Sequence, residues 1–134
     1  MNLLLDTHLL LWALSNDKRL SKEARSMIMD EDNMIYFSSV SVWEVVLKHS
    51  LHPKNVTITG KDFSQYCLQA GFIPLEMTPF HAISVESLSY ENSLQVHNDP
   101  FDRMLIGQAK SERYLFLTHD KLLAGYGEKC VRIV

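Results

Sequence analysis

The sequence predicts an α/β domain with three layers, in which helices cover both faces of a central, mainly parallel sheet. The main observation is that short apolar runs alternate with longer segments of helical periodicity along the chain. The 134 residues show no repeat and no linker, so we expect one domain over residues 1–134. With 46% hydrophobic and 22% charged residues, the composition is typical of a folded protein and argues against disorder.

The first half of the chain is expected to contain two strands separated by helices. The apolar run at residues 2–5 is typical of a strand buried on both faces. Ser21 is the expected N-cap of one helix, and Gly71 the expected cap at the end of another. In order, we predict a strand over 2–5, helices over 7–14 and 22–30, a strand over 34–37, and helices over 41–50 and 60–70.

The second half repeats the alternation. Thr78 and Pro79 suit the N-cap and the first position of a helix. We predict a strand over 72–77, a helix over 79–88, a polar loop over 89–98, a helix over 100–112, and strands over 114–118 and 131–134.

The bulk charge limits how the protein can bind its partners. A net charge of −3 and a pI near 6.0 mean that nucleic acid would need a local basic patch or bound cations. Cys67 and Cys130 have no metal-ligand spacing and are expected to be reduced thiols. The apolar N-terminus lacks a basic region, and Asp6 and His8 interrupt it. We therefore expect a cytoplasmic protein without a membrane segment.

Four acids come from four separate segments and are expected at one edge of the sheet. Asp6 and Asp120 follow predicted strands, whereas Glu44 and Asp102 lie near the starts of predicted helices. Function collects at the carboxyl ends of strands in open α/β sheets. Carboxylates gathered there repel one another and need hard divalent cations such as Mg²⁺ or Mn²⁺. The residues alone therefore predict an acidic metal site suited to phosphoryl chemistry.

Each acid also has a purely structural interpretation. Asp6 and Asp99 are suitable helix N-caps, and for Asp99, before Pro100, the cap is the favoured interpretation. Glu44 and Asp102 would be favoured near helix starts by the helix dipole. Asp120 in the segment THDK would suit a turn. Sequence spacing alone does not establish that these side chains converge.

Four stretches together resemble the PIN domain, and specifically the toxin ribonuclease of a bacterial toxin–antitoxin pair, the VapC type. They are LLLDTHLLLWAL, SSVSVWEV, HNDPFDRMLIGQA and LFLTHD. The first and third are specific, the other two are shorter, and the resemblance extends over essentially the whole chain.

The resemblance implies an Mg²⁺-dependent endoribonuclease with an α/β/α fold, and Mn²⁺ is the alternative ion. Asp6, Glu44, Asp102 and Asp120 match the catalytic and metal-binding acids. Asp99 matches an additional acid, and Thr118 matches a hydroxyl that supports the pocket. The resemblance also implies RNA as the substrate, a cognate antitoxin as a protein partner, and a homodimer.

Several other polar and aromatic residues have two interpretations. His8, His97 and His119 would indicate a transition metal as ligands, but local hydrogen bonding is the favoured interpretation. Arg103 is expected in a surface ion pair rather than on a phosphate. Trp12 and Trp43 are expected to be core or interface anchors rather than platforms for base stacking. Two basic groups are expected to be solvated surfaces rather than RNA contacts: Lys18, Arg19, Lys22 and Arg25, and Lys48, His49, His52 and Lys54.

Two rival functions are consistent with the same residues. Another metal-dependent phosphohydrolase or nuclease, acting on DNA or small phosphate esters, would share the acids. A non-catalytic α/β binding module would use them only as caps. The pattern of Leu9, Leu10, Ala13 and Ile28 is a candidate partner surface, and core packing explains it equally well.

Overall fold

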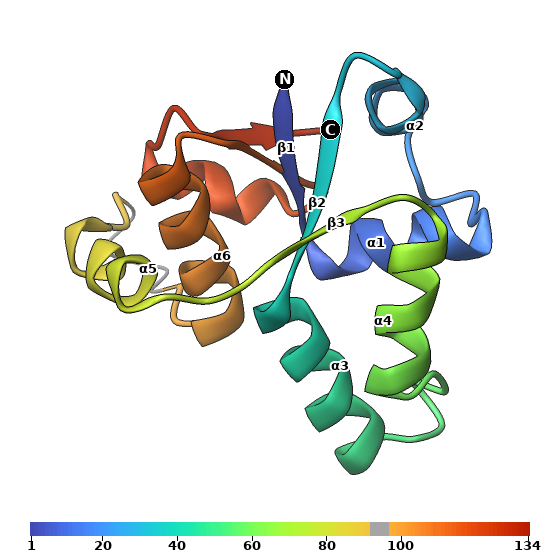
Figure 1. Ribbon diagram of the computed structural model, residues 1–134. Helices are drawn as coiled ribbons and strands as arrows, with labels where there is room; N and C mark the ends of the chain where they lie inside the picture. The colour runs from blue at the N-terminus through green and yellow to red at the C-terminus, as the bar shows by residue number, and fades with distance from the viewer. Residues whose placement is uncertain (92–96) are drawn as a thin grey trace.

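The computed structural model describes residues 1–91 and 97–134, and its elements form three layers around a central sheet (Figure 1). The elements up to residue 69 are β1 (Asn2–Leu5), α1 (Thr7–Ser15), α2 (Lys22–Met29), β2 (Met34–Ser38), α3 (Ser39–Leu51) and α4 (Gly60–Gln69). They are followed by β3 (Ile73–Leu75), α5 (Pro79–Ser84), the 3₁₀ helix η1 (Val85–Ser87), α6 (Pro100–Glu112), β4 (Leu115–Thr118), the 3₁₀ helix η2 (Lys121–Tyr126) and β5 (Val131–Ile133).

The described strands form one sheet in the order β3-β2-β1-β4-β5, and every described pairing is parallel. In the central pairing, Leu3 lies opposite Leu115 and Leu5 opposite Leu117. From β1 the chain proceeds outward through β2 and β3, and then returns to add β4 and β5 on the other side. The strand order therefore reverses between β1 and β4, where open α/β sheets bind their ligands.

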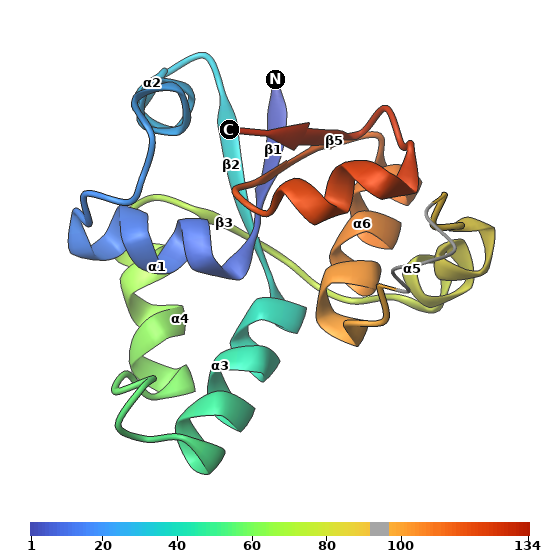
Figure 2. The same ribbon diagram turned by 180° about the vertical axis from the view of Figure 1, so that it is seen from behind.

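Alternate residues of β1 belong to two separate cores. Leu3 and Leu5 pack in the cluster that includes buried residues of α1, α2 and α4. Leu4 packs in the opposite cluster, with buried residues of α6 and η2. The two views of the ribbon show α1, α2 and α4 on one side of the sheet and α5 and α6 on the other (Figures 1 and 2). The prediction of three layers around a parallel sheet is confirmed.

Three predicted elements differ in detail from the structure. The helix predicted over 41–50 begins earlier, at Ser39, because the Ser38 side chain accepts a hydrogen bond from the Val40 amide at 2.9 Å and caps it. The strand predicted over 72–77 is limited to β3, an edge strand in which Pro74 has no amide hydrogen. The helix predicted over 79–88 ends at Ser84 and continues as the 3₁₀ turn η1.

Two further segments complete the comparison. The 3₁₀ helix η2 was not predicted, because a six-residue 3₁₀ segment has no long apolar periodicity. Of the polar loop predicted over 89–98, residues 92–96 lie outside the described residues.

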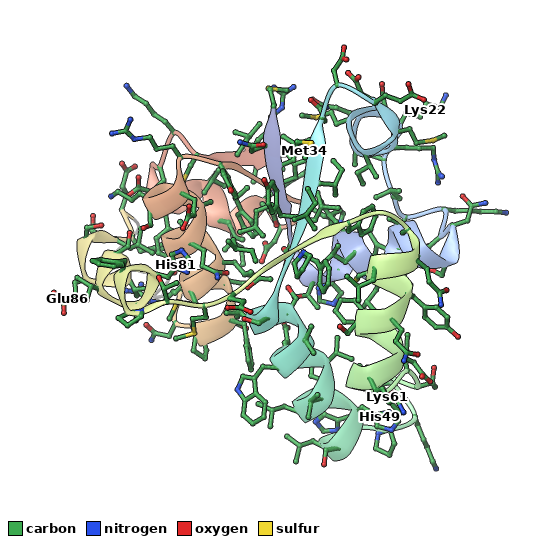
Figure 3. All side chains as sticks on the ribbon, in the orientation of Figure 1. Lys22, Met34, His49, Lys61, His81 and Glu86 are labelled. Carbon is green, nitrogen blue, oxygen red and sulfur yellow. The ribbon has the colours of Figure 1, made fainter. Side chains whose placement is uncertain are left out.

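A buried polar network joins β2, α5 and α6. The Ser38 hydroxyl donates to Gln108 Oε1 at 2.5 Å, and the Gln108 amide nitrogen lies 3.3 Å from His81 Nδ1. His81 Nε2 lies 2.7 Å from a carboxylate oxygen of Glu112. Figure 3 shows the labelled His81 between α5 and α6. The network fixes α6 relative to the end of β2, from which α3 begins.

Both cysteines are free thiols, as predicted, and burial raises the pKa of the Cys67 thiol to about 12. None of the helices within the described residues combines the length and apolarity that crossing a bilayer requires.

Candidate functional site

The predicted acids lie at the carboxyl edge of the sheet, near the point where the strand order reverses. Asp6 directly follows β1, and Asp120 follows β4 with one residue between. Asp102 lies in the first turn of α6. Because α3 begins at Ser39, Glu44 lies in its second turn and not in the first turn, where the helix dipole would favour it.

Asp6 occupies the N-cap position of α1, but its side chain makes no capping hydrogen bond. Instead, its Oδ2 atom accepts a hydrogen bond from the Thr118 hydroxyl at 2.7 Å. The same hydroxyl oxygen accepts the Asp120 amide at 3.1 Å. Burial raises the pKa of Asp6 despite the hydrogen bond from Thr118. Thr118 therefore links the two acids that follow β1 and β4.

Glu44 is almost completely buried and is held from two directions. The Thr7 hydroxyl donates to its Oε1 atom at 2.7 Å, and the ammonium group of Lys48 donates to Oε2. Burial lowers the pKa of Lys48, but the Glu44 carboxylate outweighs this effect and the net shift is upward. Lys48, predicted to belong to a solvated surface, is therefore the cation that balances Glu44.

Asp102 lies in a largely buried and strongly acidic environment. Its side chain is only 16% exposed. Burial and then repulsion from the carboxylates of Asp6, Asp99, Glu44 and Asp120 raise its pKa to about 8. Acids from four separate segments thus stand close enough to oppose one another's ionisation. A carboxyl group in such surroundings stays ionised near neutral pH only if a cation approaches it.

Asp99 and Asp120 also have the structural roles considered for them. Asp99 is the N-cap of α6, and its Oδ1 atom accepts the amides of Phe101 at 2.9 Å and Asp102 at 3.0 Å. Asp120 Oδ1 accepts the Leu122 amide at 2.9 Å and caps η2. In both residues the capping hydrogen bonds go to Oδ1 alone. Each carboxylate can therefore cap its helix and still present Oδ2 to a ligand.

His97 belongs to the site, although the favoured interpretation gave it only local hydrogen bonds. Within residues 1–91 and 97–134, His97, Asp102 and Asp120 form the one group of three metal-ligating side chains whose ligand atoms all lie within 4.8 Å of one another. His97 Nε2 is 3.3 Å from Asp102 Oδ2, and Nδ1 is 2.6 Å from the Tyr126 hydroxyl. The signal in the sequence was the position of His97, two residues before Asp99.

The structure also gives the surroundings of the other candidate residues. Among the described residues Arg103 has no ion-pair partner: its guanidinium lies 5.7 Å from the centre of the Tyr126 ring and 3.4 Å from its hydroxyl. Trp12 is buried, as a core anchor would be, and Trp43 is 56% exposed, so only the interface interpretation stays open for Trp43. The pattern that suggested a partner surface belongs to the core, because Leu9 and Leu10 are buried and Ala13 and Ile28 pack against them.

The donor set is chemically suited to a divalent cation. Carboxylate oxygens are the ligands preferred by Mg²⁺ and Mn²⁺. Asp102 and Asp120 come within reach of each other, and Asp6 and Glu44 are oriented by Thr118 and Thr7. The nearby imidazole of His97 suits Mn²⁺ better than Mg²⁺.

Comparisons with known proteins identify the family and agree with the fold. The sequence model of the PIN domain matches residues 3–129. No curated protein matches the chain significantly. A crystal structure of VapBC2 from Rickettsia felis, bound to a DNA fragment from its promoter, is similar with a TM-score of 0.69, 13% identity, and coverage of 100% of this chain and 98% of that chain. VapBC-1 from nontypeable Haemophilus influenzae gives a TM-score of 0.66 at 14% identity, with coverage of 99% and 98%. Because the family match extends over nearly the whole sequence and the fold agrees, this chain belongs to the PIN domain family.

Proposed function

We propose that this protein is a metal-dependent endoribonuclease of the VapC type, the toxin of a bacterial toxin–antitoxin pair that acts in the cytoplasm. The observation that carries the proposal is the environment of Asp102, whose pKa is raised to about 8 among converging carboxylates. Perturbed acids at a strand-order reversal indicate a reactive site rather than a set of helix caps. The membership of the PIN domain family supports nuclease chemistry.

Asp6, Glu44, Asp102 and Asp120 would hold Mg²⁺ or Mn²⁺, with Asp99 as an additional ligand. When bound, the ion supplies Lewis acidity to a water molecule and to the scissile phosphate. Thr118 and Thr7 orient the carboxylates of Asp6 and Glu44 through their hydroxyl groups. His97 faces Asp102 and is fixed on its other side by Tyr126, so it restrains the rotation of the Asp102 carboxylate.

An antitoxin is the proposed protein partner, because both similar structures are VapBC assemblies. The surface offers a place for it beside the acids. A largely apolar hollow of about 500 Å³ lies between α3 and α6, and Trp43, Leu47 and Met104 line it. A second hollow of about 440 Å³ lies on the other side of Trp43. An amphipathic segment that inserts apolar side chains on both sides of Trp43 would fit this surface.

A homodimer is proposed through α5. Phe80 and Ile83 lie one helical turn apart and are 77% and 60% exposed. Large neighbouring apolar side chains exposed in this way are typical of protein contact surfaces.

The test of the proposed activity is cleavage of a labelled single-stranded RNA pool by the purified protein. Cleavage is expected in Mg²⁺, and its loss in EDTA and in Asp102→Asn. Asp62→Asn is the matched control, because Asp62 occupies the same position in the first turn of α4 that Asp102 occupies in α6. Retained cleavage by Asp102→Asn, or equal loss in both variants, would contradict the assignment of Asp102.

The rival functions give different results in the same preparation. A general phosphohydrolase would hydrolyse labelled DNA or bis(p-nitrophenyl) phosphate as readily as the RNA pool. A non-catalytic binding module would cleave nothing, and Mn²⁺ would not raise its melting temperature, whereas an ion that binds only the folded state must raise it.

A further inference from the structure

We propose that a groove along α1, the α1 groove, binds the single-stranded RNA that leads into the acidic site. The groove is lined by His8, Trp12, Arg19, His119 and Lys121, with the acids Asp6 and Asp120 at one end. The inference rests on the proposed function and specifies the side from which the substrate approaches. These five residues come from two segments, residues 8–19 and 119–121, which lie far apart in the sequence and meet only in the fold.

The groove is continuous with the acidic site. One hollow of about 710 Å³ includes Asp6 and Asp120 together with His8, Trp12 and Arg19. A second hollow of about 460 Å³ shares His8, Trp12 and Arg19 and extends to the loop after α3. Each hollow has the size of a small-molecule site. Two such hollows joined end to end suit an extended chain of several nucleotides better than a single nucleotide.

Aromatic side chains form the floor and walls of the α1 groove. Trp12 lines the groove and is only 7% exposed, so it reports on the groove from beneath its surface. The His119 ring meets it edge to face at 4.9 Å between ring centres, and the His8 ring lies 6.0 Å away. Both histidines are exposed. The exposed imidazole rings of His8 and His119 can accept any nucleobase by stacking, which is the usual way to hold single strands without sequence readout.

A fixed guanidinium provides positive charge in the α1 groove. Arg19 lies 5.1 Å from the centre of the Trp12 ring, and its Nε and Nη2 atoms donate to Asp17 at 3.1 and 2.8 Å. Asp17 also lines the second hollow, but its carboxylate is committed to Arg19. The side chain of Arg19 is still 68% exposed. A guanidinium already held in place loses less conformational entropy when it binds a phosphate.

The opposite side of the acidic site has a different chemistry. There the hollow between α3 and α6 is lined mainly by apolar side chains such as Trp43, Phe101 and Met104. A polyanionic strand gains little from such a surface, whereas the α1 groove offers cations and rings. The α1 groove therefore suits a nucleic acid, and the hollow between α3 and α6 suits a protein partner.

The first experiment uses Trp12 as a reporter. The chain has two tryptophans, so Trp43→Phe leaves Trp12 as the single fluorophore. In the Asp102→Asn, Trp43→Phe background, titration with a randomised 12-nucleotide RNA in Mg²⁺ is expected to quench Trp12 emission. Adding Arg19→Ala is expected to weaken binding about tenfold and to reduce the slope of log affinity against log salt by about 0.7, the loss of one phosphate contact on a single strand. His119→Ala is expected to weaken binding about fivefold with the salt slope unchanged.

Lys129→Ala is the matched control. Lys129 is exposed and precedes β5, so it lies at the amino edge of the sheet, opposite the site. Its removal changes the net charge as Arg19→Ala does and is expected to leave the affinity within twofold. In the protein with Asp102, Arg19→Ala is expected to raise the KM for RNA about tenfold at unchanged kcat.

The outcomes separate this inference from the proposed function. If the protein with Asp102 cleaves RNA but Arg19→Ala and His119→Ala match Lys129→Ala in affinity and KM, the strand follows another path and the inference is wrong. If the protein neither cleaves nor binds RNA in Mg²⁺ or Mn²⁺, the proposed function fails and the inference fails with it.

Discussion

At Asp102 a carboxyl group with little access to water faces several other acids, and this conflict links stability to ion binding. Without a cation the ionised side chain opposes folding, because its pKa is raised to about 8. An ion bound there relieves the repulsion. The residue that is proposed to bind the metal is therefore also a source of instability in the metal-free protein, a common trade-off at functional sites.

Asp102→Asn is expected to stabilise the metal-free protein at pH 7.5 by on the order of 2 kcal/mol, since it removes a carboxyl group whose ionisation is disfavoured in the folded state. The same change is expected to abolish the stabilisation by Mn²⁺. Thermal unfolding in EDTA and in Mn²⁺ measures both effects, with Asp62→Asn as the control. A variant that is less stable than the parent in EDTA would contradict this account of Asp102.

The pH dependence follows from the same residue. An Asp side chain in the unfolded chain titrates near 3.9, roughly 4 units below the folded pKa of about 8. Between these values the folded state holds the extra proton, so the free energy of unfolding falls as pH rises, by at most about 1.4 kcal/mol per unit. The decrease is expected to level off above pH 8 and to be smaller in Asp102→Asn.

Metal binding is expected to have the opposite dependence, because the ligand must lose its proton. Mn²⁺ affinity should increase with pH up to about 8, by no more than about tenfold per unit for one proton. Isothermal titration at pH 6, 7 and 8 tests this. An affinity that is flat over the range would show that Asp102 does not release a proton to the ion.

Individual residues could be predicted only where the local sequence determines the role. Asp99 before Pro100 predicted a cap, and the structure confirms it. The contact between Asp6 and Thr118 spans 112 positions, and no local pattern reports it. For His97, proximity to Asp99 was the only local signal, and its contact with the Tyr126 hydroxyl of η2 spans 29 positions that no local pattern reports.

At the scale of elements, the orientation of α6 depends on a buried amide. Gln108 is fully buried and joins the end of β2 to α5 through Ser38 and His81. Gly107 allows α5 to lie close against α6, since a Cβ atom there would lie 3.1 Å from the carbonyl oxygen of His81. The close packing of α5 on α6 thus determines where the first turn of α6 presents Asp102.

Gln108→Leu is expected to destabilise the protein by about 2 kcal/mol, because it leaves the Ser38 hydroxyl without an acceptor in the core and removes the amide that lies against the His81 ring. Chemical denaturation measures the change. Gln69→Leu, at the exposed end of α4, is the matched control and is expected to have little effect. A loss below 0.5 kcal/mol in Gln108→Leu would contradict the role of the amide as a cross-link.

Long periodic elements were predicted well, and short ones less so. The apolar pattern and the caps fixed the helix over 100–112 to the residue. β3 lies at the edge, so only one neighbour determines its length, and the apolar run around it extends beyond the paired residues. For η2, six residues without strong periodicity gave no signal.

At the scale of the whole molecule, the proposed functional surfaces lie around the carboxyl edge of the sheet. The acids occupy the carboxyl edge of the sheet, the α1 groove adjoins them on one side, and the apolar hollow around Trp43 adjoins them on the other. The fold class was predictable because alternation of strands and helices almost determines a parallel sheet. The strand order was not, because order depends on contacts between distant segments.

The proposed dimer predicts a measurable mass. Light scattering after size exclusion is expected to give twice the chain mass of 15.4 kDa for the parent and 15.4 kDa for the double variant Phe80→Ser, Ile83→Ser. The reason is the loss of the exposed apolar side chains of α5. Met29→Ser is the control, because Met29 is 73% exposed but lies on α2. A dimer that survives the double variant would place the contact elsewhere.

The hydrogen bond between Thr118 and Asp6 also determines when the acidic site can form during synthesis of the chain. A ribosome delivers Asp6 first and Thr118 only after more than a hundred further residues, about 10 s later at roughly 5–20 residues per second. Until β4 emerges and pairs with β1, the first acid lacks its partner. Under the proposed function, a half-made or prematurely terminated chain would therefore lack a complete site and would not cut the message from which it is translated.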